Sequence, residues 1–186
     1  MVPESAAPPS TRPPRHVELV ELPPAAIHAL AAGDLEQANR LAPILLTQYF
    51  VDADDSGVWR YRSRQLEADP SSAGWITRAI WDVDSREAVG RAGYHGPPDP
   101  VGMVEIGYAV DPLRRRQGYA RAALEVLLDR AAREPSVQTV RVTISPENAA
   151  SRLLVQQYGF LEVGEHWDEE DGLEIIFEVG AAVATA

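Results

Sequence analysis

Stretches in which hydrophobic and polar residues alternate at every second position predict β-strands along much of the chain. Polar turns join two pairs of these stretches into hairpins. The predicted strands cover residues 16–22, 75–82, 88–95, 103–110, 139–144, 160–168 and 172–179. Strands clustered in pairs, with a strand–helix–strand–helix unit in the centre, indicate an α/β or α+β fold built on a mixed sheet.

Hydrophobic residues spaced three and four positions apart predict the helices. The segment after Pro23 reads as two helices, broken near Gly33 and Asp34 and disturbed again by Pro43. Further helices are expected at 58–68, after Gly118, and at 148–158.

Three consecutive arginines, Arg114 to Arg116, stand just before Gly118, where a helix is expected to begin. The apolar stripe of this helix consists of Ala120, Ala123, Leu124, Leu127, Leu128 and Ala131. No Asp, Ser or Thr is placed to cap its first N–H groups, and the positive end of the helix disfavours added arginines. A bound anion would satisfy the N–H groups and neutralise the arginines together. A solvated arginine cluster with a water-capped helix is the alternative.

The strand at 103–110 directly precedes this turn, and its two faces differ. Val104, Ile106, Tyr108 and Val110 form a face typical of a core. On the other face Glu105 is followed by the small residues Gly107 and Ala109, which leave space beside the strand. Ligands of α/β sheets bind where a strand leads into a glycine turn and a helix N-terminus.

The composition limits the remaining possibilities. With 186 residues and 45% hydrophobic content, we expect one domain at 16–180, between a disordered proline-rich tail at 1–15 and a short tail at 181–186. A net charge of −11 argues against nucleic-acid binding. No apolar run approaches a membrane span. The absence of cysteine fits a cytoplasmic protein, and we expect a monomer or a homodimer.

Three spaced motifs resemble those of the GNAT acyl-CoA N-acyltransferases. They are the strand "VEIGYAV", the turn "RRQGYA" (Arg115 to Ala120) and the downstream "NAASRLLVQQYGF". The resemblance covers residues 76–179 and is greatest to the subgroup that contains acetyltransferases of ribosomal-protein N-termini. It implies a mostly antiparallel sheet of six or seven strands with helices on both faces. It also implies acetyl transfer from acetyl-CoA to a primary amine.

By this resemblance, the backbone of the turn holds the pyrophosphate of coenzyme A, and Gly118 lets the backbone approach it closely. The residues involved are Arg115, Arg116, Gln117, Gly118, Tyr119 and Ala120. The N–H of Ala109 or Val110 would polarise the thioester carbonyl. Asn148 would cap the last helix, contact the cofactor, or do both, and Ser151 would also lie at the cofactor.

Acetyl transfer needs a base, because an ammonium group has no free lone pair, and an acid for the departing thiolate. Glu105 is our candidate base, through a water; its alternative is a strand carboxylate paired with an arginine. Many relatives place a tyrosine acid where this chain has Val155, so that assignment fails here. Tyr158 fits the core better than the role of acid. Ser151 is the remaining candidate acid, with a helix-capping hydroxyl as its alternative.

The acceptor pocket is expected to involve His95, His166, Trp167 and Asp168. Acidic segments at 51–55 and 167–171 suggest an amine with several positive charges or a peptide N-terminus with basic flanks, although solvated turns are the more common explanation for most such acids. No histidine pair has metal-ligand spacing, so no metal is expected. The missing tyrosine acid leaves open a second reading, in which the protein is a catalytically weak or inactive acyl-CoA-binding sensor.

Overall fold

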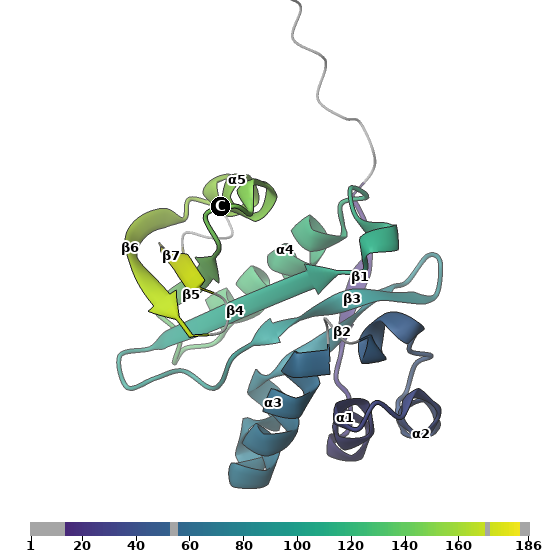
Figure 1. The fold of residues 1–186 in the computed structure, drawn as a ribbon. Coiled ribbons are helices and arrows are strands. Elements are labelled where there is room, and N and C mark those ends of the chain that lie inside the picture. The colour runs from purple at the N-terminus through teal and green to yellow at the C-terminus, as the bar shows by residue number, and fades with distance from the viewer. Residues whose placement is uncertain (1–13, 53–55, 170–171, 183–186) are drawn as a thin grey trace, which may run out of the picture.

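The computed structural model describes residues 14–52, 56–169 and 172–182, and these contain a single twisted sheet of seven strands (Figure 1). The strands are β1 (Val17–Val20), β2 (Thr77–Asp82), β3 (Glu87–Tyr94), β4 (Met103–Val110), β5 (Thr139–Ile144), β6 (Leu161–Asp168) and β7 (Gly172–Gly180). Their order across the sheet is β1-β2-β3-β4-β5-β7-β6. All neighbours are antiparallel except β4 and β5, which confirms the expected mostly antiparallel sheet.

Helices cover both faces of this sheet, as Figure 1 shows. The α-helices are α1 (Pro24–Ala31), α2 (Leu35–Leu41), α3 (Ser56–Ala68), α4 (Tyr119–Arg133) and α5 (Ala149–Gln156). Short 3-10 helices are η1 (Gln48–Val51), η2 (Pro70–Trp75) and η3 (Pro112–Arg114). No helix of the described segments is long and apolar enough to span a membrane.

Alternation along the strands creates two separate cores. In β2, Ile80 packs into the core shared with α4, whereas its neighbour Ala79 packs into the core formed by α1 and α3. The second core includes the stacked rings of Phe50 and Trp59, whose centroids are 5.9 Å apart. The helices within residues 23–68 therefore form a separate layer over one face of the sheet.

The predicted helix break is confirmed, and its physical cause is visible. Gly33 adopts a φ of +75°, which ends α1, and the Asp34 carboxylate accepts a hydrogen bond of 2.8 Å from the Gln37 amide at the start of α2. Helix α2 ends at Leu41, because Ala42 precedes Pro43 and is extended.

The central feature of the sheet is a short parallel ladder between β4 and β5. It pairs Met103 with Thr139, Val104 with Val140, and Glu105 with Arg141. Beyond these three pairs the two strands run on without pairing to each other, β4 as far as Val110 and β5 as far as Ile144. The sheet therefore opens along residues 106–110, between its two antiparallel halves.

Candidate active site

Helix α4 begins beside this opening, and its start has the geometry that the turn predicts. Gly118 occupies the cap position with a φ of +93°, a conformation that favours glycine, and no side chain caps the helix. Arg116 also has a positive φ, of 62°, at a cost of about 1–2 kcal/mol. The first N–H groups of α4 thus face a cavity rather than a capping side chain.

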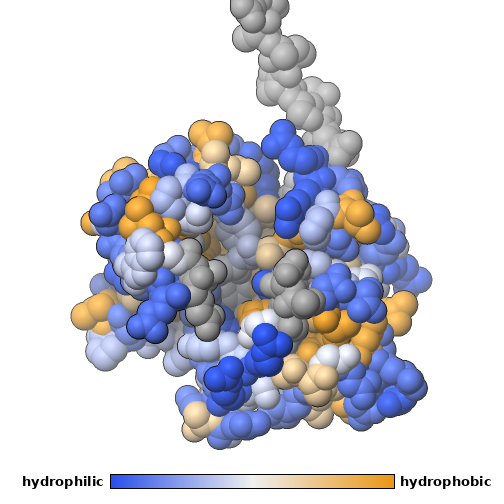
Figure 2. All heavy atoms as spheres, viewed as in Figure 1, coloured by the Kyte–Doolittle hydropathy of each residue, from blue (hydrophilic) through white to orange (hydrophobic). Residues whose placement is uncertain are grey.

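That cavity, which we call the α4 cavity, has a volume of about 510 Å³. It runs from the arginine turn along the end of β4 to the first turn of α5. Its lining residues are Tyr108, Ala109, Val110, Arg114, Arg115, Arg116, Gly118, Tyr119, Ala120, Arg121, Asn148, Ala150, Ser151 and Leu154. The structure therefore brings nearly all of the predicted cofactor residues together around one space. Figure 2 shows this face of the molecule, which is mostly hydrophilic and is hollowed near its centre.

The three arginines of the turn have different surroundings. Arg114 pairs with Glu87 at 2.8 Å, and Arg115 donates to the Val110 carbonyl at 3.2 Å. Arg116 is exposed and contacts no hydrogen-bond or ion-pair partner in the described segments. A surface arginine without an acidic partner, next to uncapped N–H groups, fits the phosphate chemistry of a cofactor such as coenzyme A.

A fourth arginine joins this turn, and the sequence did not indicate it. Arg15, which the sequence places at the end of the predicted tail, donates to both the backbone and side-chain oxygens of Gln117 at 3.1 Å. Its guanidinium also lies over the Tyr119 ring, 4.8 Å from the centroid. The predicted tail boundary remains untested, because residues 1–13 lie outside the described part of the chain.

The backbone of β4 directs amides into the opening of the sheet. The Glu105 carbonyl accepts a hydrogen bond from the His95 amide, and the Asp111 amide donates one to the Val89 carbonyl, so both groups point toward β3. Because successive residues of a strand point their amides to opposite sides, those of Tyr108 and Val110 point toward β5. Between the two predicted candidates, Val110 rather than Ala109 thus has its N–H directed into the opening.

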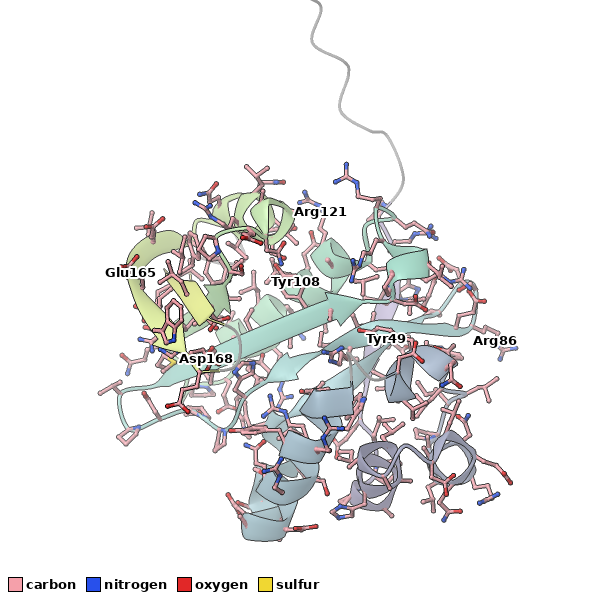
Figure 3. The ribbon with its side chains drawn as sticks, in the orientation of Figure 1. Tyr49, Arg86, Tyr108, Arg121, Glu165 and Asp168 are labelled. Atoms are coloured by element: carbon pink, nitrogen blue, oxygen red, sulfur yellow. The ribbon has the colours of Figure 1, made fainter. Side chains whose placement is uncertain are left out.

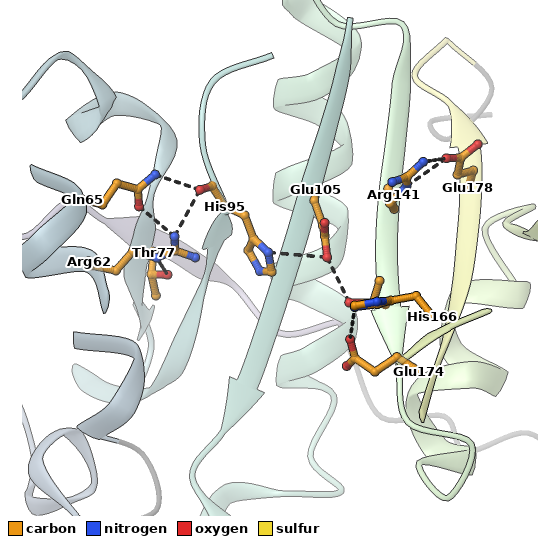
Figure 4. A network of polar contacts seen from close by, with 10 residues as sticks. Arg62, Gln65, Thr77, His95, Glu105, Arg141, His166, Glu174 and Glu178 are labelled. Carbon is orange, nitrogen blue, oxygen red and sulfur yellow. Dashed lines mark hydrogen bonds and ion pairs between the residues drawn. The ribbon is translucent and has the colours of Figure 1, made fainter. Parts of the chain in front are cut away.

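Glu105 lies beside polar groups rather than beside an arginine partner. Its Oε1 accepts a hydrogen bond of 2.9 Å from the Thr143 hydroxyl and lies 3.5 Å from His95 Nδ1. Its neighbour on β5, Arg141, pairs with Glu178 instead, at 2.6 Å (Figure 4). The alternative of an arginine-paired strand carboxylate is therefore wrong for Glu105.

The two residues that contact the Glu105 carboxylate, His95 and Thr143, each border a further cavity. His95 borders the α3 cavity, about 210 Å³, lined by Val58, Arg62, Thr77, Arg91, His95, Gly107, Tyr108 and Ala109. Thr143 borders the β5 cavity, about 470 Å³, lined by Gly107, Tyr108, Val142, Thr143, Ile144, Ser145, Asn148, Ser151 and Glu174. Glu105 itself lines neither cavity. It would therefore act on a molecule bound there through His95, through Thr143 or through a water.

The His95 ring packs against β4 at Gly107, where the absence of a side chain leaves room for it. A Cβ at Gly107 would come within 2.9 Å of His95 Nε2, so the imidazole occupies the space that glycine frees. Burial lowers the pKa of His95; the Glu105 carboxylate opposes this shift and Arg62 adds to it. The imidazole is therefore neutral near pH 7.

The first turn of α5 distinguishes the roles of Asn148 and Ser151. The Asn148 side chain accepts a hydrogen bond of 3.1 Å from the Ser151 amide, so Asn148 is the cap. The Ser151 hydroxyl is not the capping group, so the alternative of a helix-capping hydroxyl does not hold for Ser151. Ser151 borders both the α4 and the β5 cavity, as Asn148 does.

Tyr108 is a site residue that sequence reasoning missed. Alternation assigned it to the core face, but it is half-buried and borders all three cavities, at the position labelled in Figure 3. Its enclosed hydroxyl forms no hydrogen bond of ordinary geometry within the described residues. Burial raises the pKa of Tyr108, and the Ser151 hydroxyl beside it acts against that rise. In the sequence, its position directly after Gly107 was the only feature that indicated open space beside it.

Tyr158, the other tyrosine considered as an acid, lines none of these cavities. The Tyr158 ring packs against the core, while its hydroxyl contacts Glu125 and accepts a hydrogen bond of 3.1 Å from Arg121. Val155 is fully buried.

Three predicted acceptor residues lie on the hairpin of β6 and β7 and line none of the three cavities, but His166 lies next to Glu174, which lines the β5 cavity (Figure 4). His166 approaches Glu174 at 4.0 Å, and Trp167 is 72% exposed. Asp168 ends β6, and Figure 3 shows it on the hairpin, far from Tyr49 and Arg86 at the other side of the sheet. Their role in acceptor binding stays a prediction.

Parts of both acidic segments, residues 53–55 and 170–171, lie outside the described residues. Within the described segments, no group of three acidic or histidine side chains could hold a metal.

Comparisons with known proteins agree with this geometry. Residues 20–161 match the acetyltransferase (GNAT) domain family. The uncharacterized N-acetyltransferase YjdG of Bacillus subtilis (strain 168) is 33% identical over 96 residues, which are 52% of this chain and 57% of YjdG. An L-2,4-diaminobutyric acid acetyltransferase of Streptomyces anulatus is 29% identical over 150 residues, covering 68% of this chain and 84% of that enzyme.

Solved structures share the fold at low sequence identity. One of them is RimL, a ribosomal L7/L12 α-N-protein acetyltransferase in complex with coenzyme A. It superposes with a TM-score of 0.63 at 17% identity, covering 90% of this chain and 95% of RimL. Because the domain match spans more than half of the chain and agrees with the sheet, the turn and the cavity, the protein belongs to the GNAT acetyltransferase family.

Proposed function

We propose that this protein transfers an acetyl group from acetyl-CoA to a small primary amine by direct attack of the amine. The observation that carries the proposal is the junction of the α4 cavity with the opening of the sheet, beside Glu105. Acetyl-CoA would supply the activated acyl group as a thioester. The turn at 115–120 and Arg116 would hold its phosphates, and Asn148 and Ser151 would border the path to the opening.

Glu105 is the proposed base. Thr143 fixes one of its oxygens, and a quarter of the side chain is exposed, which leaves access for a water. Through this water, Glu105 would take the proton that the amine loses as its nitrogen bonds to the acyl carbon and the carbon–sulfur bond breaks. The Val110 amide, directed into the opening, is placed to stabilise the developing negative charge on the acyl oxygen.

Ser151 is the proposed acid for the departing thiolate. Its hydroxyl is not used in capping α5, and it lies where the α4 and β5 cavities meet. Tyr108 beside it keeps its proton at neutral pH, because burial raises its pKa, and can return a proton to Ser151.

The acceptor is proposed to be a compound of amino-acid size. The α3 cavity, with a volume of about 210 Å³, is smaller than the roughly 300–1,000 Å³ of pockets that take drug-sized ligands, which favours a small acceptor. The similarity to a diaminobutyric acid acetyltransferase supports a small diamine as the first acceptor to test.

The test is the release of CoA thiol from acetyl-CoA with a panel of small amines, with the product identified by mass spectrometry. We expect Glu105→Gln to lower kcat by about 10²–10⁴-fold while leaving acetyl-CoA affinity unchanged. Glu162→Gln, the same change at an exposed position of β6, is the matched control. Equal activity of the two variants would reject Glu105 as the base. Tight acetyl-CoA binding without turnover of any amine would favour the sensor reading instead.

A further inference from the structure

Arg62 of α3 is a buried cation that has no acidic partner among the described residues. Only 3% of the residue is exposed. Its Nε donates to the Thr77 hydroxyl at 2.9 Å, and its Nη1 donates to the Gln65 side chain at 2.8 Å and to the His95 carbonyl at 3.1 Å. All three acceptors are neutral, and no described carboxylate pairs with the guanidinium. Figure 4 shows these contacts reaching from α3 to the strand beside β4.

An uncompensated buried charge is costly, so its retention calls for an explanation. Burial lowers the pKa of Arg62 to about 10, with the charges of Tyr61 and Glu105 opposing the shift. The guanidinium therefore stays charged at neutral pH. Glu105 does not neutralise it by contact, because that carboxylate is engaged by Thr143 and lies next to His95.

The guanidinium borders the α3 cavity, whose described lining includes two arginines. Arg91, from β3, is a second arginine in the lining, and it donates to the Tyr49 hydroxyl at 2.7 Å. No acidic residue is among the described residues of this lining. A small anion entering the cavity would gain attraction from the Arg62 guanidinium in partly desolvated surroundings.

The opposite wall of the same cavity is the backbone of β4. Gly107, Tyr108 and Ala109 line it, at the opening where the acetyl group would be delivered. A molecule filling the space would thus place one end toward the acyl group and its other end toward Arg62. This arrangement differs from the sequence-based expectation of an acceptor with several positive charges.

We propose that the acceptor is an amino carboxylate, and that Arg62 binds its carboxylate group while the amine faces β4. The inference rests on the proposed function and adds the substrate class. Arg62 acts as a specificity residue: it selects acceptors by their negative end and takes no part in the proton transfers.

Three acceptors of nearly equal length test the inference without any mutation. They are 2,4-diaminobutyric acid, its carboxamide, which removes the negative charge, and 1,3-diaminopropane, which removes the whole carboxyl group. In the unmodified protein we expect kcat/KM to be about 10- to 100-fold higher for the amino acid than for the other two, mainly through KM. Equal values for all three would overturn the role of Arg62 and leave the acetyltransferase proposal standing.

The variant Arg62→Gln should remove the preference by lowering kcat/KM for the amino acid alone. Arg64→Gln, the same change at an exposed position of α3, is the matched control. Arg62→Lys retains the charge and should retain part of the preference even where the glutamine variant folds poorly. A loss of activity with all three acceptors in equal proportion, or a preference that persists in Arg62→Gln, would show a structural role only.

Calorimetric titration of 2,4-diaminobutyric acid into the protein with CoA separates this inference from the proposed function. Binding that Arg62→Gln abolishes, in a protein that acetylates no amine, would uphold the site and reject the transfer reaction. Absence of both binding and turnover would reject both.

Discussion

Replacing Gly107 with alanine would test the arrangement of His95, Glu105 and the two cavities that meet at this glycine. The new Cβ would lie 2.9 Å from His95 Nε2, whereas ordinary contacts begin near 3.4 Å, so the imidazole must retreat by about 0.5 Å or more. The 3.5 Å approach of His95 Nδ1 to Glu105 would lengthen, and the methyl group would narrow the path between the cavities.

The expected result is a loss of activity without a loss of stability. The backbone of Gly107 does not need a positive φ, and alanine in a compatible conformation gains about 0.4–1 kcal/mol from the unfolded state. Because the half-exposed His95 ring can rotate, we expect the free energy of unfolding to change by less than about 1 kcal/mol. Misplacement of the acceptor should lower kcat/KM by about 10- to 100-fold.

The measurements are urea unfolding, acetyl-CoA affinity and steady-state kinetics with the best amine. Acetyl-CoA affinity should stay constant, because Gly107 does not border the α4 cavity. Gly164→Ala on β6 is the matched control, since an added Cβ there meets no atom within 4 Å. Activity of Gly107→Ala equal to that of the control would refute the reasoning, as would a collapse of stability.

Two further predictions concern the start of α4. Gly118→Ala forces a side chain into a φ of +93°, so we expect a loss of about 1–2 kcal/mol in urea unfolding together with weaker CoA binding by calorimetry; unchanged binding would show that the turn does not hold the cofactor. Burial alone would raise the pKa of Asp82, but hydrogen bonds, including the 2.6 Å bond from the Tyr119 hydroxyl, outweigh it and lower the pKa below 3.8. This stabilisation is present above pH 3.8 and is lost as the pH falls through the lowered folded-state pKa, so Tyr119→Phe should cost about 1–3 kcal/mol at pH 7 and less at an acid pH where folded Asp82 is protonated. Acid titration of the unfolding free energy checks this, and an equal loss at both pH values would contradict it.

The fold was predictable where the local pattern is strong. Alternation placed β4 and β5 at their observed ends, because both strands have a buried face and a less buried one. The glycine turn and the break at Gly33 followed equally from local chemistry. These features depend on residues close together in the sequence.

The site could be predicted only in part, for the same reason. The cofactor residues lie in three short motifs, each continuous along the chain, so local sequence located them. Arg62 and Arg15, by contrast, reach their places from distant segments, and their contacts depend on how α3 and the start of the chain pack against the sheet. For Tyr108, alternation gave the correct face but could not show that this face opens into cavities where the β4–β5 ladder ends.

The short ladder between β4 and β5 also has a consequence for cooperativity. Each half of the sheet is an antiparallel unit, β1 to β4 on one side and β5 to β7 on the other, and three residue pairs join the two strands at the boundary. The halves are therefore natural candidates for separate foldons, and the amides of Tyr108 and Val110, which point into the opening, should exchange with solvent faster than those of β3. A ligand that spans the boundary contacts both halves. At a hundred times its Kd it would add about 2.7 kcal/mol to their joint stability and couple their opening into one event.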